Sequence, residues 1–397
     1  MKLSLQRRWV YIVSLGALLI SLLSLTSCAG DSSGTSGPYA TNGGKGCTKV
    51  GILMPETNSS DRWENKDHPL LEQAIKAAIP GVHIDYGNAL ANSNTQLSQA
   101  EADLANGDCI LVVGAHDSVA AAKIVEKAKA QNVPVIAYDR MIQSKDLNYY
   151  VSFDNIKVGA LQAQYIADHY QKYQQTGTET TLGISATPGT TTPPPAAINT
   201  MMISGSQSDN NALLFSMGAH SVLDPLFAAG KLKNIYENFT PNWDGNIAEA
   251  EAEATLADMQ NNVQIAYVAN DIMAGGVINA LKAAGLSGKV LVTGQDATAQ
   301  AVHAILAGEQ SMTVYKPIAK EAQAVGDLVK AIYDGSDVNT LTNGATTATF
   351  NGGNIPSILA KPVSVDKNNV SSTVIADKYL SARDVCSGLP PGTGGVC

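Results

Sequence analysis

The amino-acid sequence predicts two α/β lobes in series, each built around a doubly wound parallel sheet. The 397 residues allow two domains of ordinary size. From Lys49 onward, short apolar runs alternate with longer stretches of helical period, which is typical of βαβ units and a parallel sheet. The alternation restarts after about residue 180, so the second half predicts a second lobe of the same kind.

In the first half, apolar runs predict strands, and the periodic stretches that separate them predict helices. The expected strands are 50–54, 82–86, 110–114, 134–138 and 149–153. The expected helices are about 63–79, 94–106, 117–131 and 156–174.

The second half predicts the same order of elements and a hinge of several chain crossings. Its expected strands are 181–185, 233–239, 264–268, 290–293 and 312–315. Its expected helices are near 210–229, 246–261, 272–284, 297–307 and 318–334. Crossings are expected near 155–180, 296–318 and 350–365. The expected lobes are 48–160 completed by about 297–350, and 161–296 completed by about 351–380, with a tail at 381–397.

One segment, from Thr187 to Ser208, breaks this rhythm. It contains Pro188, three consecutive prolines at 193–195 and several threonines, glycines and serines. Such a composition favours an extended or mobile loop over a further element. We therefore expect an insertion at the edge of one lobe.

Residues 1–27 have the layout of a secretory signal, with a basic start, an apolar run and small residues before a cut. Cys28 follows directly, a placement that resembles the bacterial lipobox, in which this thiol is lipidated and becomes the new N-terminus. We expect Cys28 to be a membrane anchor, joined to the body by a flexible linker at 28–47. The alternative is an uncleaved transmembrane helix, although serine and glycine residues dilute the run and no stop-transfer charges follow it. In both cases the body lies outside the cytoplasm.

The charge balance argues against a nucleic-acid partner. Without Lys2, Arg7 and Arg8, the chain has 23 basic and 35 acidic residues, a net charge near −12. This excess of negative charge repels phosphate backbones, whereas a neutral small ligand is compatible with it.

Four cysteines follow Cys28, and export makes disulfides between them possible. Cys47 and Cys109 each come just before an expected apolar strand. If those strands are neighbours in a parallel sheet, their starting ends lie side by side, which favours a Cys47–Cys109 bridge. Cys386 and Cys397 would close a small loop in the tail. Buried or free thiols remain the alternative.

Polar side chains are expected to gather beyond the carboxyl ends of the strands, where open α/β sheets bind ligands. The structural alternatives are a helix N-cap for Asp139 and Asp296, a tight turn for Asn270, solvation for Lys316 and core packing for Trp243. Two mature-chain arginines and both of its tryptophans lie in short polar clusters, and a guanidinium with an indole suits a small polyhydroxylated ring. The residues concerned are Arg62, Trp63, Asp139, Arg140, Trp243, Asn270, Asp271, Asp296 and Lys316.

Catalytic motifs find little support in the sequence. The chain has no Gly-x-Ser-x-Gly elbow, no P-loop and no His-Glu-x-x-His, and its histidines lie in unrelated contexts. Gly275 and Gly276 fall inside an expected helix, where close packing explains them better than phosphate binding. We expect no metal, no nucleotide, no other cofactor and no catalytic residue.

Several motifs in order resemble those of the xylose-binding proteins of bacterial ABC sugar importers. The resemblance runs from about Lys49 to Tyr379 and rests on Ala-Tyr-Asp-Arg-Met-Ile (137–142), Ser-Phe-Asp-Asn-x-Lys-Val-Gly (152–159), Asp-Asn-Asn-Ala (209–212), Ser-Gly-Lys-Val (287–290), Gly-Gln-Asp-Ala (294–297), Met-Thr-Val-Tyr-Lys-Pro-Ile (312–318) and Val-Asp-Lys-Asn-Asn-Val (365–370).

This resemblance implies a type I periplasmic-binding fold, in which two lobes joined by three crossovers close on a pyranose. It implies sugar contacts from Arg62, Trp63, Asp139, Arg140, Asn211, Trp243, Asn270, Asp296 and Lys316, with Asp209 and Asn210 as weaker candidates. Carboxylates would accept hydrogen bonds from hydroxyls, cations would donate, amides would do both, and the indoles would cover the ring's C–H faces.

The expected function is therefore a membrane-tethered receptor that delivers a monosaccharide, D-xylose first, to an ABC permease. A monomer is expected for this class. One alternative is a broader aldose receptor that feeds chemotaxis or a sensor kinase. A transcription repressor would need an N-terminal helix-turn-helix and a basic face, which the chain lacks. A glycosidase is opposed because neighbouring cations would keep Asp139 and Asp296 ionised.

Overall fold

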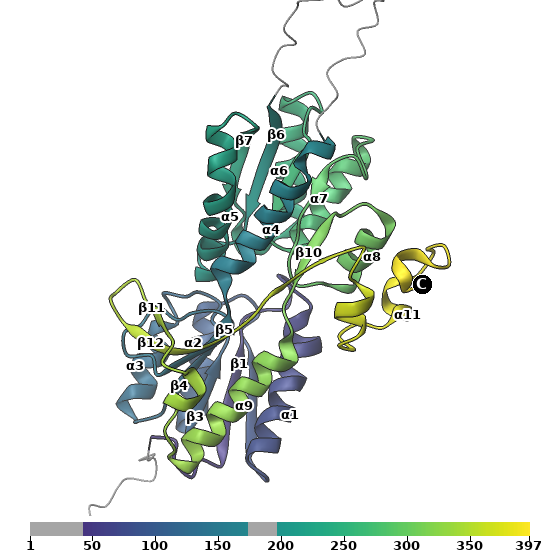
Figure 1. Cartoon of the computed structure of the whole chain (residues 1–397). Coiled ribbons are helices and arrows are strands. Elements are labelled where there is room, and N and C mark those ends of the chain that lie inside the picture. Colours follow the sequence, from purple (N-terminus) through teal and green to yellow (C-terminus); the bar gives the residue numbers. More distant parts are fainter. Residues whose placement is uncertain (1–42, 174–196) are drawn as a thin grey trace, which may run out of the picture. The chain divides into compact units, whose positions relative to one another are not determined.

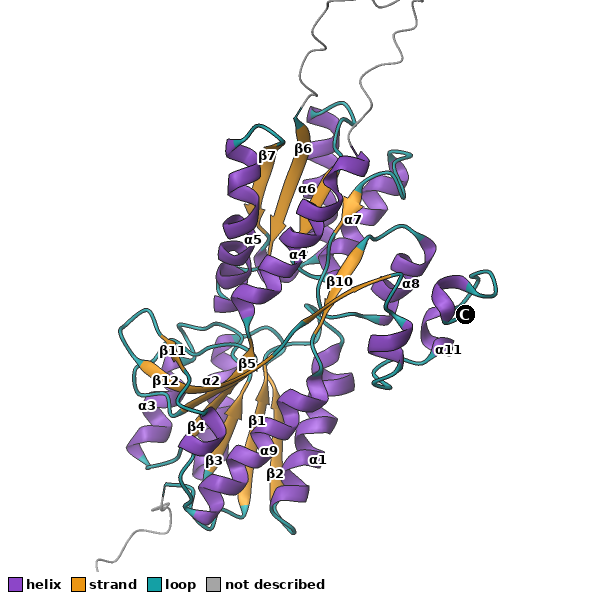
Figure 2. Cartoon of the chain, viewed as in Figure 1, coloured by secondary structure: helices purple, strands orange, loops and turns teal. Residues whose placement is uncertain are grey.

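The computed structural model describes residues 43–173 and 197–397. The expected signal at 1–27, Cys28, most of the linker and the expected strand at 181–185 lie outside the described residues. The described residues form two larger sheets with helices packed against them, so the α/β class is as predicted (Figure 2).

The first sheet has seven strands among the described residues, in the order β11-β12-β5-β4-β3-β1-β2 (Figure 1). Strands β1 to β5 and β12 pair in parallel, and β11 is antiparallel to β12. The strands are β1 (Lys49–Met54), β2 (His83–Asn88), β3 (Ile110–Val113), β4 (Val135–Tyr138), β5 (Tyr149–Phe153), β11 (Thr346–Ala348) and β12 (Asn354–Ala360). All five strands expected in the first half are confirmed.

Helices cover both faces of this sheet because side chains along a strand alternate between its faces. Ile52 and Met54 pack in one core with α1 and α9, and Leu53 packs in the other with α2 and α3. In Figure 1 the green α9 lies beside the purple α1, although the two are far apart in the sequence. The helices are α1 (His68–Ala78), α2 (Ser93–Ala105), α3 (Ala122–Ala130) and α9 (Ile318–Asp334).

The second sheet runs β7-β6-β8-β9 in the described part of the chain, and β10 pairs with β13 beside it. A parallel bridge between Gln295 and Val314 connects β10 to the end of β9. The strands are β6 (Ile198–Ser204), β7 (Leu232–Phe239), β8 (Ile265–Val268), β9 (Leu291–Val292), β10 (Met312–Tyr315) and β13 (Val363–Asp366). The helices are α4 (Asn155–His169), α5 (Asn210–Ala228), α6 (Gly245–Asp258), α7 (Asp271–Ala283) and α8 (Ala299–Ala307).

The described chain also contains several short helical elements. They are π-helical turns at Trp63–Asp67 and Ser371–Ile375, 3₁₀ turns at Tyr170–Tyr173, Pro241–Trp243 and Thr393–Gly395, and the short helices α10 (Asn339–Thr342) and α11 (Ala382–Val385).

The chain crosses between the sheets after β5, after β10 and after β12. Helix α4 packs on α5, α9 packs on α1, and β12 pairs with β5. The expected ranges gave 297–350 to the first lobe and 351–380 to the second. Sheet pairing instead puts 299–315 with the second sheet and 318–360 with the first. Helical period does not tell which sheet a helix covers, so the sequence could not set these boundaries.

The expectation of a loop across Thr187 to Ser208 is wrong at its C-terminal end. Residues Ile198–Ser204 form β6, which is buried along its whole length between β7 and β8. The signal was the apolar run Met201-Met202-Ile203, which stands just before the helix that begins at Asn210. The prolines and threonines upstream of this run led to the prediction of a loop instead of a strand. Residues 187–196 lie outside the described part.

The structure joins the four described cysteines as Cys47–Cys109 and Cys386–Cys397. The first pair stands next to β1 and β3, which are neighbours in the sheet. These are the pairings that strand proximity and tail length favoured. Within the described ranges, no helix combines the length and apolar character needed to cross a bilayer.

The two adjacent glycines of α7 have different surroundings. A Cβ at Gly276 would lie 2.0 Å from the carbonyl oxygen of Gly245, at the start of α6. A Cβ at Gly275 would meet nothing within 4 Å. Close packing of α6 on α7 therefore requires a glycine at position 276 but not at position 275.

We expect Gly276→Ala to lower the free energy of unfolding by about 1–3 kcal/mol, because the added methyl overpacks the α6–α7 contact. The matched change Gly275→Ala should raise it by about 0.5–1 kcal/mol, since alanine favours a helix interior where space is free. Urea unfolding of the two variants measures both effects, and equal effects would contradict the packing role.

Candidate functional site

Polar side chains from both sheets surround one cavity at the carboxyl ends of the strands. The space among these side chains, including the part open to solvent, is about 290 Å³. The nine side chains that the resemblance assigned to sugar contact all line it: Arg62, Trp63, Asp139, Arg140, Asn211, Trp243, Asn270, Asp296 and Lys316.

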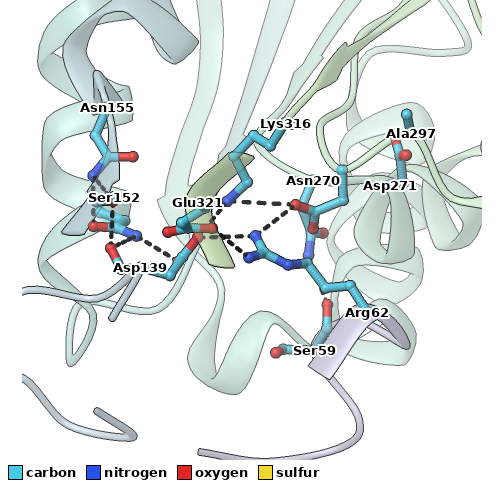
Figure 3. A network of polar contacts seen from close by, with 12 residues as sticks. Ser59, Arg62, Asp139, Ser152, Asn155, Asn270, Asp271, Ala297, Lys316 and Glu321 are labelled. Atoms are coloured by element: carbon cyan, nitrogen blue, oxygen red, sulfur yellow. Dashed lines mark hydrogen bonds and ion pairs between the residues drawn. The ribbon is translucent and has the colours of Figure 1, made fainter. Parts of the chain in front are cut away.

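Arg62 is the most heavily bonded of these side chains and is 2 % exposed (Figure 3). Its guanidinium donates to Asp67 over 2.6 and 2.8 Å, to Asp139 over 2.9 Å and to Glu321 over 3.1 Å. These carboxylates come from the start of α1, the end of β4 and the first turn of α9. Burial raises the pKa of Glu321 well above its usual value, even though Arg62 opposes this effect.

Asp139 lies between two buried cations. Its Oδ2 accepts from Arg62 and also from Lys316 Nζ over 3.0 Å. Burial alone would raise the pKa of this carboxyl, but the charges of Arg62 and Lys316 outweigh burial and hold the pKa well below its usual range. Asp139 is therefore a fixed hydrogen-bond acceptor and a poor general acid, which opposes a glycosidase mechanism.

The backbone at Asp139 is held in the left-handed region, with a φ of 56°. Its carbonyl oxygen accepts from Tyr150 Oη over 2.9 Å, Ser152 Oγ over 2.6 Å and Asn211 Nδ2 over 3.1 Å. Few non-glycine residues adopt this conformation, and where they do, surrounding contacts must hold it in place. These bonds aim the carboxylate at Arg62 and Lys316.

Arg140 joins the first lobe to the start of α5. Its guanidinium lies 2.7 Å from Glu56 Oε1 and 2.8 Å from Asp209 Oδ2, and it donates to Ser59 Oγ over 3.3 Å. Burial raises the pKa of Asp209 to about 6, although Arg140 lowers it. Asp209 also caps α5 by accepting from the Asn211 backbone. The capping residue of α5 is thus also an ion-pair partner of the opposite lobe.

The two asparagines of the second lobe each have a structural and an interlobe contact. Asn270 accepts from the Met273 backbone as the cap of α7, and its Nδ2 donates to the Ser59 carbonyl over 2.9 Å. Asn211 Oδ1 accepts from Asn155 Nδ2, and Asn211 Nδ2 donates to Asp139. The capping role considered for Asn270 is therefore real and coexists with a place at the cavity.

The indoles of Trp63 and Trp243 are both buried. The guanidinium carbons of Arg62 and Arg140 lie 4.8 and 5.2 Å from the Trp63 ring centroid. Trp243 makes an edge contact with Phe215, with centroids 6.1 Å apart. A Cβ at Gly205 would lie 2.1 Å from the Trp243 ring, so only glycine leaves room for it. The cavity thus receives two aromatic surfaces from different lobes.

The geometry around β10 decides the structural alternatives considered for Asp296 and Lys316. Asp296 is no helix cap, because Thr298 caps α8, and its φ of 102° is supported by the bond from Tyr379 Oη to its carbonyl. Lys316 is 3 % exposed, and its Nζ lies 3.5 Å from Asp296 Oδ1. The lysine is therefore paired and buried rather than solvated. Asp271 points away into bonds with Gln310 and Thr313.

Sequence reasoning missed several members of the site. The cavity is also lined by Ser59, Ser60, Asp209, Phe215 and Gln295, of which Asp209 was a weaker candidate. In the part of the chain that the structure describes, Ser60 Oγ, Gln295 Oε1 and Trp243 Nε1 are buried without a hydrogen-bond partner. Gln295 precedes Asp296, and Phe215 stands one helical turn after Asn211, so neighbouring positions carried the signal. No sequence pattern pointed to Asp67 and Glu321, the two further carboxylates that accept from Arg62.

A second carboxylate cluster lies at the opposite edge of the first sheet. Oxygens of Asp85, Asp103 and Asp108 come within 4.8 Å of one another. Lys49 Nζ lies 2.9 Å from Asp85 Oδ2 and 3.5 Å from Asp108 Oδ1. Since this lysine neutralises part of the charge, the cluster alone does not identify a metal site.

Comparisons with known proteins relate this geometry to a family. Residues 50–337 match the profile of the periplasmic binding protein domain. The chain is 35% identical over 339 residues to the D-xylose-binding periplasmic protein of Haemophilus influenzae, covering 85% of this chain and 92% of that protein. It is 33% identical over 351 residues to the multiple sugar-binding periplasmic receptor ChvE of Rhizobium radiobacter, covering 84% and 91%.

Solved structures agree with these relatives. An ABC transporter solute binding protein from Clostridium phytofermentans with bound β-D-glucose superposes with a TM-score of 0.72 at 29% identity, covering 85% of this chain and 99% of that one. A carbohydrate transporter solute binding protein from Chloroflexus aurantiacus in complex with D-glucose gives 0.70 at 30% identity, covering 86% and 98%.

We expect Asp139→Asn to lower the free energy of unfolding by about 3–5 kcal/mol, because two buried cations lose their shared counter-charge while asparagine still tolerates the positive φ. Asp146→Asn is the matched control, since Asp146 pairs with Lys129 over 2.7 Å at the surface. The control should unfold in urea as the parent does. Equal midpoints for the two variants would contradict the importance of the buried network.

Proposed function

Because the chain belongs to the periplasmic binding protein family, we propose that it captures one monosaccharide between its lobes and delivers it to an ABC importer. The family is one of extracytoplasmic sugar-binding proteins, and the chain is not an enzyme. The first candidate ligand is D-xylose, since relatives at 33–35% identity are named for this sugar. A broader aldose range is the alternative, supported by the multiple sugar-binding relatives at 33–34%.

The observation that carries this proposal is the lining of the cavity. Fixed acceptors, fixed donors and amides converge there with two indoles. Hydroxyl groups can both donate and accept, so a sugar ring satisfies all of these groups. Charge-assisted hydrogen bonds from Arg62, Arg140 and Lys316 are the strongest of these contacts. Buried unpartnered atoms such as Trp243 Nε1 and Gln295 Oε1 gain partners from further hydroxyls.

Binding stabilises the closed arrangement because both lobes contribute to the cavity. Asn270 reaches Ser59 across the cleft, Asn211 reaches Asp139, and Arg140 pairs with Asp209. A ligand that contacts both lobes favours the form in which they are together. Closure also removes water, which strengthens every polar contact with the sugar.

Titration calorimetry with xylose, glucose, galactose, arabinose and ribose tests the ligand class. We expect one-to-one binding of at least one of these aldoses by the chain without residues 1–27. Tight binding of xylose alone supports a dedicated xylose importer, and binding of several aldoses supports the broader receptor. No binding of any of the five contradicts sugar capture.

Arg140→Ala should weaken binding of the preferred sugar by about 100-fold or more, because truncating one partner of a buried charge pair costs at least about 2–3 kcal/mol. Arg383→Ala is the control, since this third arginine of the mature chain is exposed on α11. Calorimetry measures both affinities, and thermal melting checks that each variant is folded. Unchanged affinity in a folded Arg140→Ala protein would overturn the site assignment.

The proposal includes a lipid anchor at Cys28, which the lipobox-like residues before it support. Cys28→Ser should move the protein from the membrane fraction to the soluble extracytoplasmic fraction, because each buried acyl CH₂ contributes about 0.8 kcal/mol of membrane affinity. Ser33→Ala, in the same linker, should stay with the membrane. Fractionation followed by immunoblotting separates the outcomes, and a Cys28→Ser protein retained in the membrane would contradict the anchor.

A further inference from the structure

Among the contacts that join the two lobes outside the cavity, one is made by Lys66 and Tyr379. Lys66 Nζ donates to the carbonyl oxygen of Tyr379 over 2.8 Å and lies 5.1 Å from the centroid of its ring. Lys66 belongs to the π-helical turn Trp63–Asp67 that leads into α1 of the first lobe. Both residues stand outside the set of described residues that line the cavity. The contact therefore does not require sugar.

Tyr379 itself is fixed to the second lobe. It packs in an apolar cluster with Ala297, Tyr315 and Leu380, and its ring centroid lies 4.9 Å from that of Tyr315. His303 of α8 is hydrogen-bonded to the Val385 carbonyl over 3.0 Å, which secures the following segment. The Cys386–Cys397 disulfide closes the tail beyond it. Tyr379 thus moves with the second lobe.

The same tyrosine supports the cavity wall from behind. Its hydroxyl donates to the carbonyl oxygen of Asp296 over 3.2 Å, at a residue with a φ of 102°. Tyr315, its ring partner, directly precedes Lys316. On the other side, Lys66 stands three residues after Trp63. The Lys66–Tyr379 contact therefore ties together the backbones that carry sugar-contacting side chains of both lobes.

We propose that Lys66 and Tyr379 form a latch outside the cavity that stabilises the closed form and so sets the lifetime of bound sugar. This inference rests on the proposed sugar capture. A contact made only when the lobes are together adds free energy to the closed state alone. Since the latch touches no sugar, it changes the affinity for every ligand by the same factor. Selectivity stays with the cavity.

The test measures sugar dissociation rates by stopped-flow tryptophan fluorescence, with the mature chain and each aldose that binds. Lys66→Met should raise the dissociation rate by about 5–10-fold, as expected for loss of one charge-assisted hydrogen bond. The factor should be equal for all sugars, and the association rate should change less than about 2-fold, since interface changes act mainly on dissociation. Lys66→Arg should restore the parent rate.

Three further variants complete the experiment. Lys76→Met is the control, because this lysine of α1 pairs only at the surface with Glu72 and should leave dissociation unchanged. Tyr379→Phe removes only the hydrogen bond to Asp296. If the two contacts act together, the double variant Lys66→Met/Tyr379→Phe should raise the dissociation rate by less than the product of the two single increases.

The outcomes separate the latch from the proposed function. Parent protein that binds no aldose contradicts sugar capture and the latch with it. Parent protein that binds, with an unchanged dissociation rate in Lys66→Met, overturns the latch alone. Unequal factors for different sugars also overturn it, because they place the effect in the cavity. Thermal melting without sugar checks that each variant is folded.

Discussion

The burial of the Arg62 guanidinium is the constraint on which the rest of the site depends. A buried cation needs carboxylate partners, and here they come from three distant segments: Asp67, Asp139 and Glu321. Satisfying them fixes the start of α1 against the end of β4 and the first turn of α9. Because Asp139 also holds Lys316, one ion network aligns both cations and a carboxylate before any sugar enters.

This arrangement explains how a site lined by charges suits a neutral ligand. Arg62, Arg140 and Lys316 each have a carboxylate within 3.0 Å, so their charge is compensated inside the protein. A sugar hydroxyl can accept from these cations and donate to these carboxylates. The two indoles then supply the apolar contact that hydroxyl exchange with water cannot.

In the proposed function, the residues that select the sugar differ from those that set how long it stays bound. Cavity residues such as Asn270 and Asp139 line the space proposed for the sugar ring. Tyr379 of the second lobe donates to the Asp296 carbonyl outside the cavity and contacts Lys66 of the opposite lobe. A receptor that passes its ligand to a partner needs closure of limited strength, and a contact outside the cavity adjusts that strength without changing the cavity.

The sequence by itself determined five of the seven described strands of the first sheet and the helical stretches, because apolar period is a local signal. Polar residues at strand ends pointed to cavity residues such as Asp139, Asn270 and Lys316, whereas Asn211 came only from the motif resemblance. It misjudged β6, whose short apolar run was overshadowed by prolines upstream. Only the tertiary structure decided which sheet residues 299–315 and 318–360 join, and that Asp67 and Glu321 hold Arg62. Arg62 and Glu321 are 259 positions apart, and no local pattern records a partner at that separation.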